Sequence, residues 1–202
     1  IASTADLLDI EVMDNVNSMA VTGEELASYL NEGAADTSVM ISSVLVQKEN
    51  SGNGVIVDIK TPENITQITE EQYTNAAITA GVADATILVA SVSRVTGESA
   101  LTGIYKAFDA NGEKLDQDRM EVAQEELEAT SEIADDADLD EEESGRFDGV
   151  IVDIKQQLAD IKDRTDQLAT REEIEQIIND ALAKYDLQNV ISVDNINILI
   201  NY

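Results

Sequence analysis

Three segments in the first half of the chain have the hydrophobic pattern of β-strands. Residues 38–48, SVMISSVLVQK, are rich in β-branched side chains, and residues 55–60 alternate between two faces. The glycine-rich turn at 51–54 separates them, which predicts an antiparallel hairpin. Residues 85–92, ATILVASV, form a continuous apolar run and predict a strand that is covered on both faces.

Helices with capping signals alternate with these strands. Thr22 and Glu25 form a capping box before GEELASYL, and Thr69 with Gln72 forms a second box. Gly81 stands where a left-handed C-cap would end the second helix. The inward stripe of that helix is narrow and made mostly of small residues: Tyr73, Ala76, Ala77 and Ala80.

The order of these elements predicts the fold class. With a short strand at 19–21, the order is strand, helix, strand, strand, helix, strand. This βαββαβ order is that of a ferredoxin-like sandwich. We therefore expect an α+β protein in which the sandwich is followed by helices and a C-terminal helical hairpin.

The chain after residue 97 has a helical period throughout. Helices are expected at 98–110 and 116–134, and the second has an apolar face at Met120, Ala123, Leu127 and Thr130. Residues 135–146 hold one leucine among seven acids and predict an exposed acidic linker. The expected domains are therefore an α+β sandwich with trailing helices at 1–134, a linker at 135–146 and a helical region at 147–202.

Beyond the linker, a mostly apolar series recurs every three or four positions over three heptads. It comprises Phe147, Ile151, Ile154, Leu158, Ile161, Thr165 and Leu168. Thr170 and Glu173 then begin a new helix after a short junction, which predicts an antiparallel helical hairpin. Coiled coils use the same spacing, so the alternative is self-association through Ile151, Ile154, Leu158 and Ile161.

Composition narrows the range of functions. The chain of 202 residues has 42 acidic and 12 basic side chains, a net charge of −30, which argues against nucleic acid as a partner. It has no cysteine and no histidine, which removes thiol chemistry, disulfides and histidine-activated nucleophiles. No apolar run approaches 18 residues, so no membrane span is expected. A chain of this composition therefore lacks the side chains on which most soluble enzyme mechanisms depend.

The acidic runs suggest calcium binding, but each has a simpler interpretation. Asp136, Asp138 and Asp140 have the spacing of an EF-hand loop, but Glu141 occupies the glycine position and Phe147 that of the bidentate glutamate. A solvated charge run explains them better. Residues 109–113, DANGE, are explained by a glycine that ends a helix.

Three further candidates have structural explanations as well. Residues 96–99, TGES, precede a helix where backbone N–H groups can bind an anion, but Glu98 opposes a negative ligand and Thr96 or Ser99 fits a cap. Asn64 begins a glycosylation sequon that we attribute to a strand end. A pair of carboxylates could hydrolyse sugars, yet the chain has no tryptophan to bind them. We assign no catalytic, cofactor-binding or metal-ligating residue and expect no cofactor.

Three segments resemble the YpuA-like family of exported proteins from Gram-positive bacteria, a domain of unknown function. They are AVTGEELASYL, the stretch ISSVLVQKENSGNGVIVDI followed by NITQIT, and TAGVADATILVASVSRVTGESALTGIYKAF with the acidic helix ending EELEAT. The resemblance covers roughly residues 20–130 and implies export, a route for which a signal peptide is expected. It implies no activity.

These observations favour an exported, non-catalytic protein of the cell envelope or medium of a Gram-positive bacterium. Its expected role is to bind a cell-wall or extracellular protein partner through its acidic surface or its C-terminal helices. Two alternatives stay open at this point. One is a carboxylate-based hydrolase of cell-wall polymers, and the other is a structural oligomer joined by the heptad helix.

Overall fold

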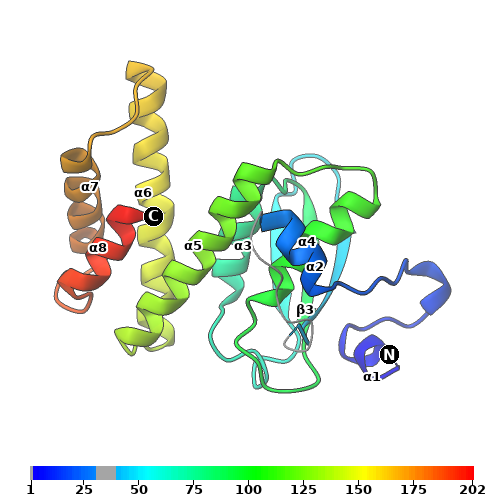
Figure 1. Cartoon of the computed structure of the whole chain (residues 1–202). Coiled ribbons are helices and arrows are strands. Elements are labelled where there is room, and N and C mark those ends of the chain that lie inside the picture. Colours follow the sequence, from blue (N-terminus) through cyan, green and yellow to red (C-terminus); the bar gives the residue numbers. More distant parts are fainter. Residues whose placement is uncertain (1, 31–39) are drawn as a thin grey trace. The chain divides into compact units, whose positions relative to one another are not determined.

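The computed structural model describes residues 2–30 and 40–202, which divide into two compact units at 1–128 and 129–202 (Figure 1). The helices and strands of the first unit are α1 (Ala2–Leu7), the 3₁₀ turn η1 (Met13–Asn15), α2 (Gly23–Leu30), β1 (Ser43–Lys48), β2 (Val55–Ile59), α3 (Glu70–Ala80), β3 (Ala85–Ala90) and α4 (Ser99–Ala110). Helix α5 (Gln117–Asp136) crosses the boundary, and α6 (Glu141–Thr165), α7 (Arg171–Lys184) and α8 (Val193–Asn201) complete the second unit.

The sheet has three strands in the order β1-β3-β2, so the predicted antiparallel hairpin is wrong. β3 is antiparallel to β1 and parallel to β2, and it separates the two strands that were expected to pair. The cause lies in the β1–β2 loop, where Asp84, just before β3, accepts hydrogen bonds from the N–H groups of Gly52 (2.8 Å) and Gly54 (2.9 Å). The loop glycines therefore hold the start of β3 instead of closing a tight turn.

The α+β class is confirmed, whereas the ferredoxin-like arrangement is not. Residues 19–21, expected as a first strand, are not part of a strand. The expected strand at 38–48 begins at Ser43 in the structure, and residues 38 and 39 lie outside the described part. The described strands thus form a smaller, mixed sheet.

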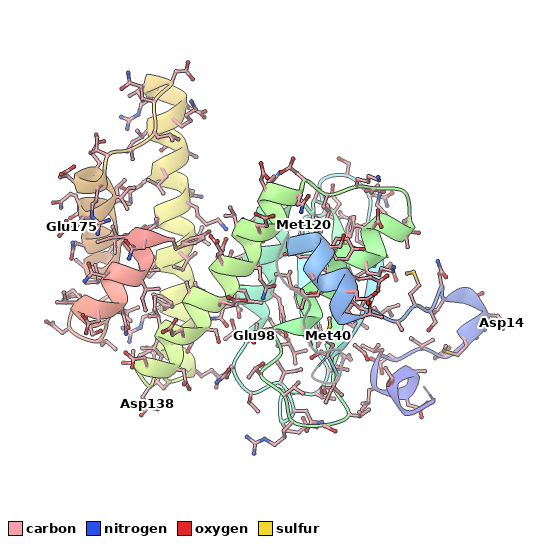
Figure 2. All side chains as sticks on the ribbon, in the orientation of Figure 1. Asp14, Met40, Glu98, Met120, Asp138 and Glu175 are labelled. Atoms are coloured by element: carbon pink, nitrogen blue, oxygen red, sulfur yellow. The ribbon has the colours of Figure 1, made fainter. Side chains whose placement is uncertain are left out.

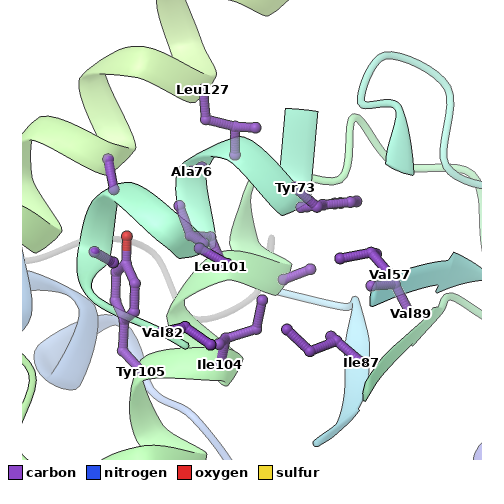
Figure 3. Packing of buried hydrophobic residues seen from close by; sticks show 14 of the residues in the cluster. Val57, Tyr73, Ala76, Val82, Ile87, Val89, Leu101, Ile104, Tyr105 and Leu127 are labelled. Atoms are coloured by element: carbon purple, nitrogen blue, oxygen red, sulfur yellow. The ribbon is translucent and has the colours of Figure 1, made fainter. Parts of the chain in front are cut away.

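The core of the first unit lies between one face of this sheet and the helices α3 and α4 (Figure 3). Val57, Ile87 and Val89 point from the sheet toward Leu101 and Ile104 of α4. The predicted stripe of α3 is fully buried, because its alanines allow the helix to pack closely. The fully buried side chains of the stripe are Tyr73, Ala76, Ala77 and Ala80.

The second unit contains the predicted antiparallel helical hairpin. Lys184 at the end of α7 pairs with Asp153 in the middle of α6, and Arg146 near the start of α6 donates a hydrogen bond to the carbonyl of Tyr185 just after α7 (3.4 Å), so the two helices run in opposite directions. Ile151 and Ile154 are 3% and 9% exposed and pack inside this unit with α7 and α8. Leu168, the last residue of the predicted apolar series, lies at the tip of the hairpin and is 82% exposed.

The segment expected as an acidic linker is mostly helical. α5 continues to Asp136, and α6 begins at Glu141. Asp140 forms a capping box with Glu143, in which each side chain accepts a hydrogen bond from the backbone N–H of the other residue. Three glutamates follow the cap in the first turn, where the helix dipole favours negative charge. The dense acids of this segment therefore belong to the start of α6.

Candidate functional site

The acidic segment that resembles an EF-hand is occupied by a turn and the start of a helix. Asp138 has a φ of 51° and makes the turn between α5 and α6, while Asp140 caps α6. Asp140, Glu141 and Glu142 border a shallow, open depression. Within residues 2–30 and 40–202, no three acidic side chains come close enough together to hold a metal ion. The carboxylates of this segment therefore cap a helix or lie in solvent.

The glycine at 112 ends α4, as the sequence predicts. Gly112 has a φ of 82°, and the side chain of Asn111 donates a hydrogen bond to the carbonyl of Ala107 (2.8 Å). Glu113 forms an ion pair with Lys48. These contacts account for residues 109–113 without a ligand.

The start of α4 is held by contacts from within the chain. Gly97 has a φ of +114°, and its carbonyl accepts a hydrogen bond from the hydroxyl of Tyr73 (2.6 Å). Burial, helped by the charge of Glu98, raises the pKa of Tyr73 well above its usual value, so this hydroxyl stays a donor. Glu98 occupies the N-cap position and makes no capping hydrogen bond with its side chain, so the expected cap by Thr96 or Ser99 is wrong.

The sequon at 64–66 lies at an isolated β-bridge outside the named strands and not at a strand end as expected. The side-chain amide of Asn64 donates a hydrogen bond to the carbonyl of Ser91 (2.8 Å), and the hydroxyl of Thr66 donates to the carbonyl of Val95 (3.0 Å). Ile65 and Val95 form an isolated parallel bridge between these bonds. The side-chain amide nitrogen of Asn64, where a glycan would be attached, is thus engaged in a hydrogen bond within the fold.

One buried acid, Glu126 on α5, was not singled out from the sequence. Its carboxylate accepts a hydrogen bond from the hydroxyl of Thr79 (2.6 Å), and only 2% of the residue is exposed. The negative charge of Glu126 adds to burial in raising the pKa of Tyr105. The sequence pattern indicated the burial of Glu126 only weakly. Glu126 lies three residues after Ala123 and beside Leu127, at the border of the predicted apolar face. Enclosed in this way, Glu126 joins α5 to α3.

The sheet face opposite the core is a second feature that the sequence did not reveal. We call it the open sheet face, and it consists of Leu45, Gln47, Ile56, Asp58, Thr86 and Leu88. The pairing register sets Ile56 beside Thr86 and Asp58 beside Leu88, while Leu45 and Gln47 flank Leu88 and Thr86 from β1. Side chains alternate along a strand, so these residues point away from buried Val57, Ile87 and Val89.

Carboxylates lie at both ends of the open sheet face. At one end, Glu49 accepts hydrogen bonds from the side chains of Gln47 (3.1 Å) and Thr86 (3.0 Å). At the other end, Lys60 forms ion pairs with Asp9 (2.8 Å) and Asp58 (3.1 Å), which raise the pKa of Lys60. Lys60, the base at this end of the face, is therefore neutralised by two acids.

Basic side chains in both units are paired with acids. Carboxylates form ion pairs with several lysines of the described residues, among them Lys48, Lys60, Lys106, Lys162 and Lys184. The guanidinium of Arg119 instead donates to the carbonyls of Ile78 (3.0 Å) and Thr79 (2.7 Å) at the end of α3. Figure 2 labels exposed acids in each unit, Asp14 in the first and Asp138 and Glu175 in the second. The negative charge is spread over the surface.

The helices give no sign of a membrane span. Throughout the described ranges, every helix is too short or too polar to cross a bilayer.

Comparison with known proteins identifies the family. Over 133 residues the chain is 36% identical to the uncharacterized protein YpuA of Bacillus subtilis (strain 168), a match that covers 63% of this chain and 44% of YpuA. The matched region thus spans less than half the length of that relative. No solved structure matches the chain. Residues 1–202 match the family described as "Protein of unknown function (DUF1002)", which agrees with the expected resemblance, and the chain therefore belongs to this family.

Proposed function

We propose that this chain is a non-catalytic binding module of an exported protein, which holds a positively charged protein partner in the bacterial cell envelope or medium. The observation that carries this proposal is the uncompensated negative charge. The net charge is −30, and five lysines are already engaged by the chain's own carboxylates. A surface with this potential attracts basic partners and repels nucleic acid and anionic polymers.

The placement of the acids supports binding over hydrolysis. A carboxylate-based hydrolase needs two acids that face each other across a substrate cleft. The depression at Asp140, Glu141 and Glu142 is shallow and open, and Asp140 is committed to the cap of α6. Glu126 is enclosed by its own unit. The chain also lacks histidine and cysteine, the side chains most often used for proton transfer and nucleophilic attack near neutral pH.

Export is supported by composition. The chain has no cysteine, so an oxidising environment would neither cross-link nor inactivate it. The high negative charge keeps a protein soluble outside the cell.

Co-sedimentation with cell-wall fragments tests the proposal. The purified chain is mixed with fragments that retain their proteins, and in parallel with fragments stripped of protein by detergent and trypsin. We expect saturable pelleting with the first preparation and none with the second. Calcium and a chelator should give the same result, because the acids at 135–143 do not converge on a metal site.

Two outcomes would contradict this function. Equal pelleting with stripped fragments would show that the chain binds the wall polymer and not a protein. Release of soluble wall fragments, abolished when a single carboxylate is replaced by its amide, would show that it is a hydrolase.

A further inference from the structure

Part of the open sheet face is apolar and belongs to no hydrophobic cluster. Ile56, on the edge strand β2, is 56% exposed, and the half-buried Leu45 and Leu88 are absent from the core between the sheet and α3–α4. Ile41 before β1 and Val92 after β3 are 41% and 49% exposed. Large aliphatic side chains gathered in this way on a sheet face are typical of a surface that packs against another element.

Within residues 2–30 and 40–202, the segment around α1 lies at one end of this face. Asp9, just after α1, reaches Lys60, which follows β2 on the side of Ile56 and Asp58. Ala5, Leu8 and Ala90 are buried, although they lie outside the main core. The α1 segment therefore lies at the Lys60 end, while Ile56 at the other end remains exposed.

The dimensions of the uncovered part suit a helix. An α-helix with its side chains is about 10 Å in diameter, so a helix that crosses the strands would cover about three residues of each strand. Ile56, Leu88 and Leu45 come from the three different strands, so a helix that crosses the strands would contact all of them.

The charges around the apolar residues specify the chemistry of the occupant. Glu49 and Asp58 lie at opposite ends of the face, and Lys60 is neutralised by Asp9 and Asp58. A helix with leucine-like residues on one face and lysine or arginine at its borders would match both features. An acidic helix would meet like charge, and a purely apolar one would bring no positive charge to the acidic ends of the face.

We propose that the open sheet face is a docking site for a basic amphipathic helix of a partner protein, which lies across β1, β3 and β2 beside the α1 segment. This inference rests on the proposed function, because it names the surface and the kind of partner for the same binding role. The apolar contacts provide affinity, and Glu49 and Asp58 orient the helix.

A synthetic helix provides the probe. The peptide has 18 residues of leucine and lysine with all leucines on one face, and a control peptide of the same composition has them dispersed. Fluorescence anisotropy with the full chain in 0.15 M salt should give at least tenfold tighter binding for the amphipathic peptide. Amide chemical-shift changes should concentrate at Gln47, Ile56, Asp58 and Leu88.

A matched pair of variants separates docking from simple charge attraction. Ile56→Glu changes the open sheet face, and Ile78→Glu changes an exposed position on α3 whose side chain is 46% exposed. Both add one negative charge, so attraction by net charge alone would leave both variants at least as tight as the wild type. Docking predicts about tenfold weaker binding for Ile56→Glu and no weakening for Ile78→Glu, since only Ile56 contacts the helix.

Several results would overturn the docking site. They are equal binding of the two peptides, equal effects of the two variants, or chemical-shift changes confined to α6 and α7. Light scattering that shows a dimer in the wild type and a monomer in Ile56→Glu would assign the face to a second copy.

The docking site and the proposed function can fail separately. If Ile56→Glu pellets with protein-bearing wall fragments as well as the wild type does, this surface is wrong and the proposed function stands. If the peptide docks at Ile56 but the chain pellets with no wall fragments, the docking site stands and the proposed function is wrong.

Discussion

The two units of this chain bury aliphatic cores in different ways. In the first unit, the core depends on β3, which lies between two strands that precede it in the sequence by more than 25 residues. In the second unit, α6 packs on α7 and α7 on α8, so each helix meets its neighbour in the chain. Hydrophobic periodicity identifies which face of an element is buried in both units. It identifies the partner only where that partner is the next element.

The largest expected effect comes from a cavity in one core. Leu101→Ala should destabilise the first unit by about 2–5 kcal/mol, because Leu101 is fully buried between α4, α3 and the sheet. Hydrogen exchange should accelerate in β3 and stay unchanged in α7. Leu182→Ala, equally buried in the second unit, is the matched variant and should do the reverse. Loss of protection in both units with either variant would show that they unfold together, and the comparison would fail.

A glycine at the start of α4 gives the next largest effect. A Cβ on Gly97 would lie 2.5 Å from the Tyr73 hydroxyl oxygen and 2.8 Å from the Ile65 Cγ2 atom. Gly97→Ala should therefore cost about 3 kcal/mol in free energy of unfolding, from strain at φ +114° and from the clash. Gly112→Ala is the control, since its φ is +82° but no atom lies within 4 Å of the added Cβ. Equal urea midpoints for the two variants would argue against tight packing at Gly97.

Helix caps allow the units to be compared at a smaller scale. Thr69 and Thr170 each accept a hydrogen bond from the N–H three residues later, in complete capping boxes of α3 and α7. Thr69→Ala and Thr170→Ala should each cost about 1 kcal/mol, measured by urea unfolding. Thr→Ser at the same positions should restore most of the stability, because serine keeps the hydroxyl. A loss above about 3 kcal/mol in only one unit would show that its cap has an additional role.

The smallest expected effect depends on pH. The side chain of Lys106 donates to the carboxylate of Glu25, which lowers the pKa of Glu25 below its usual value of 4.5. Because the folded-state pKa is lowered, the stabilisation is complete above pH 4.5 and is lost as the pH falls through the folded value. At pH 7, Glu25→Gln should melt below the wild type by an amount equivalent to about 0.2–1 kcal/mol, and the difference should shrink below pH 4.5. A difference that grows in acid would contradict the direction of the pKa shift.

Several features that depend on short-range interactions were predicted correctly from the sequence, although the cap by Thr96 or Ser99 was not. The capping boxes at Thr69 and Thr170, the end of α3 at Gly81 and the buried face of α5 each depend on residues within one helix. The hairpin between β1 and β2 was wrong because Asp84, thirty residues beyond the turn glycines, captures their N–H groups. No local pattern carries that information.

The candidate site was harder to predict than the fold. The acids at 135–143 suggested a site because they are dense, but Asp140 and Glu143 serve the start of a helix. The open sheet face was missed because Ile56 lies in a strand whose alternation suggested only a half-buried sheet, and Leu88 lies in a run expected to be covered on both sides. Which residues form the open sheet face depends on which strand lies in the middle of the sheet, and only the structure shows the strand order.

The position of β3 between β1 and β2 is the feature on which the open sheet face depends, and pairs of introduced cysteines test it most directly. The chain has no cysteine of its own, so any disulfide must come from the introduced pair. Gln47→Cys with Thr86→Cys replaces neighbours on adjacent strands and should form a disulfide under mild oxidation, as should Ile56→Cys with Thr86→Cys. Gln47→Cys with Ile56→Cys should not, because β3 holds those positions roughly 10 Å apart. Efficient cross-linking of that third pair, with failure of the first two, would show that β1 and β2 form a hairpin and that the open sheet face does not exist.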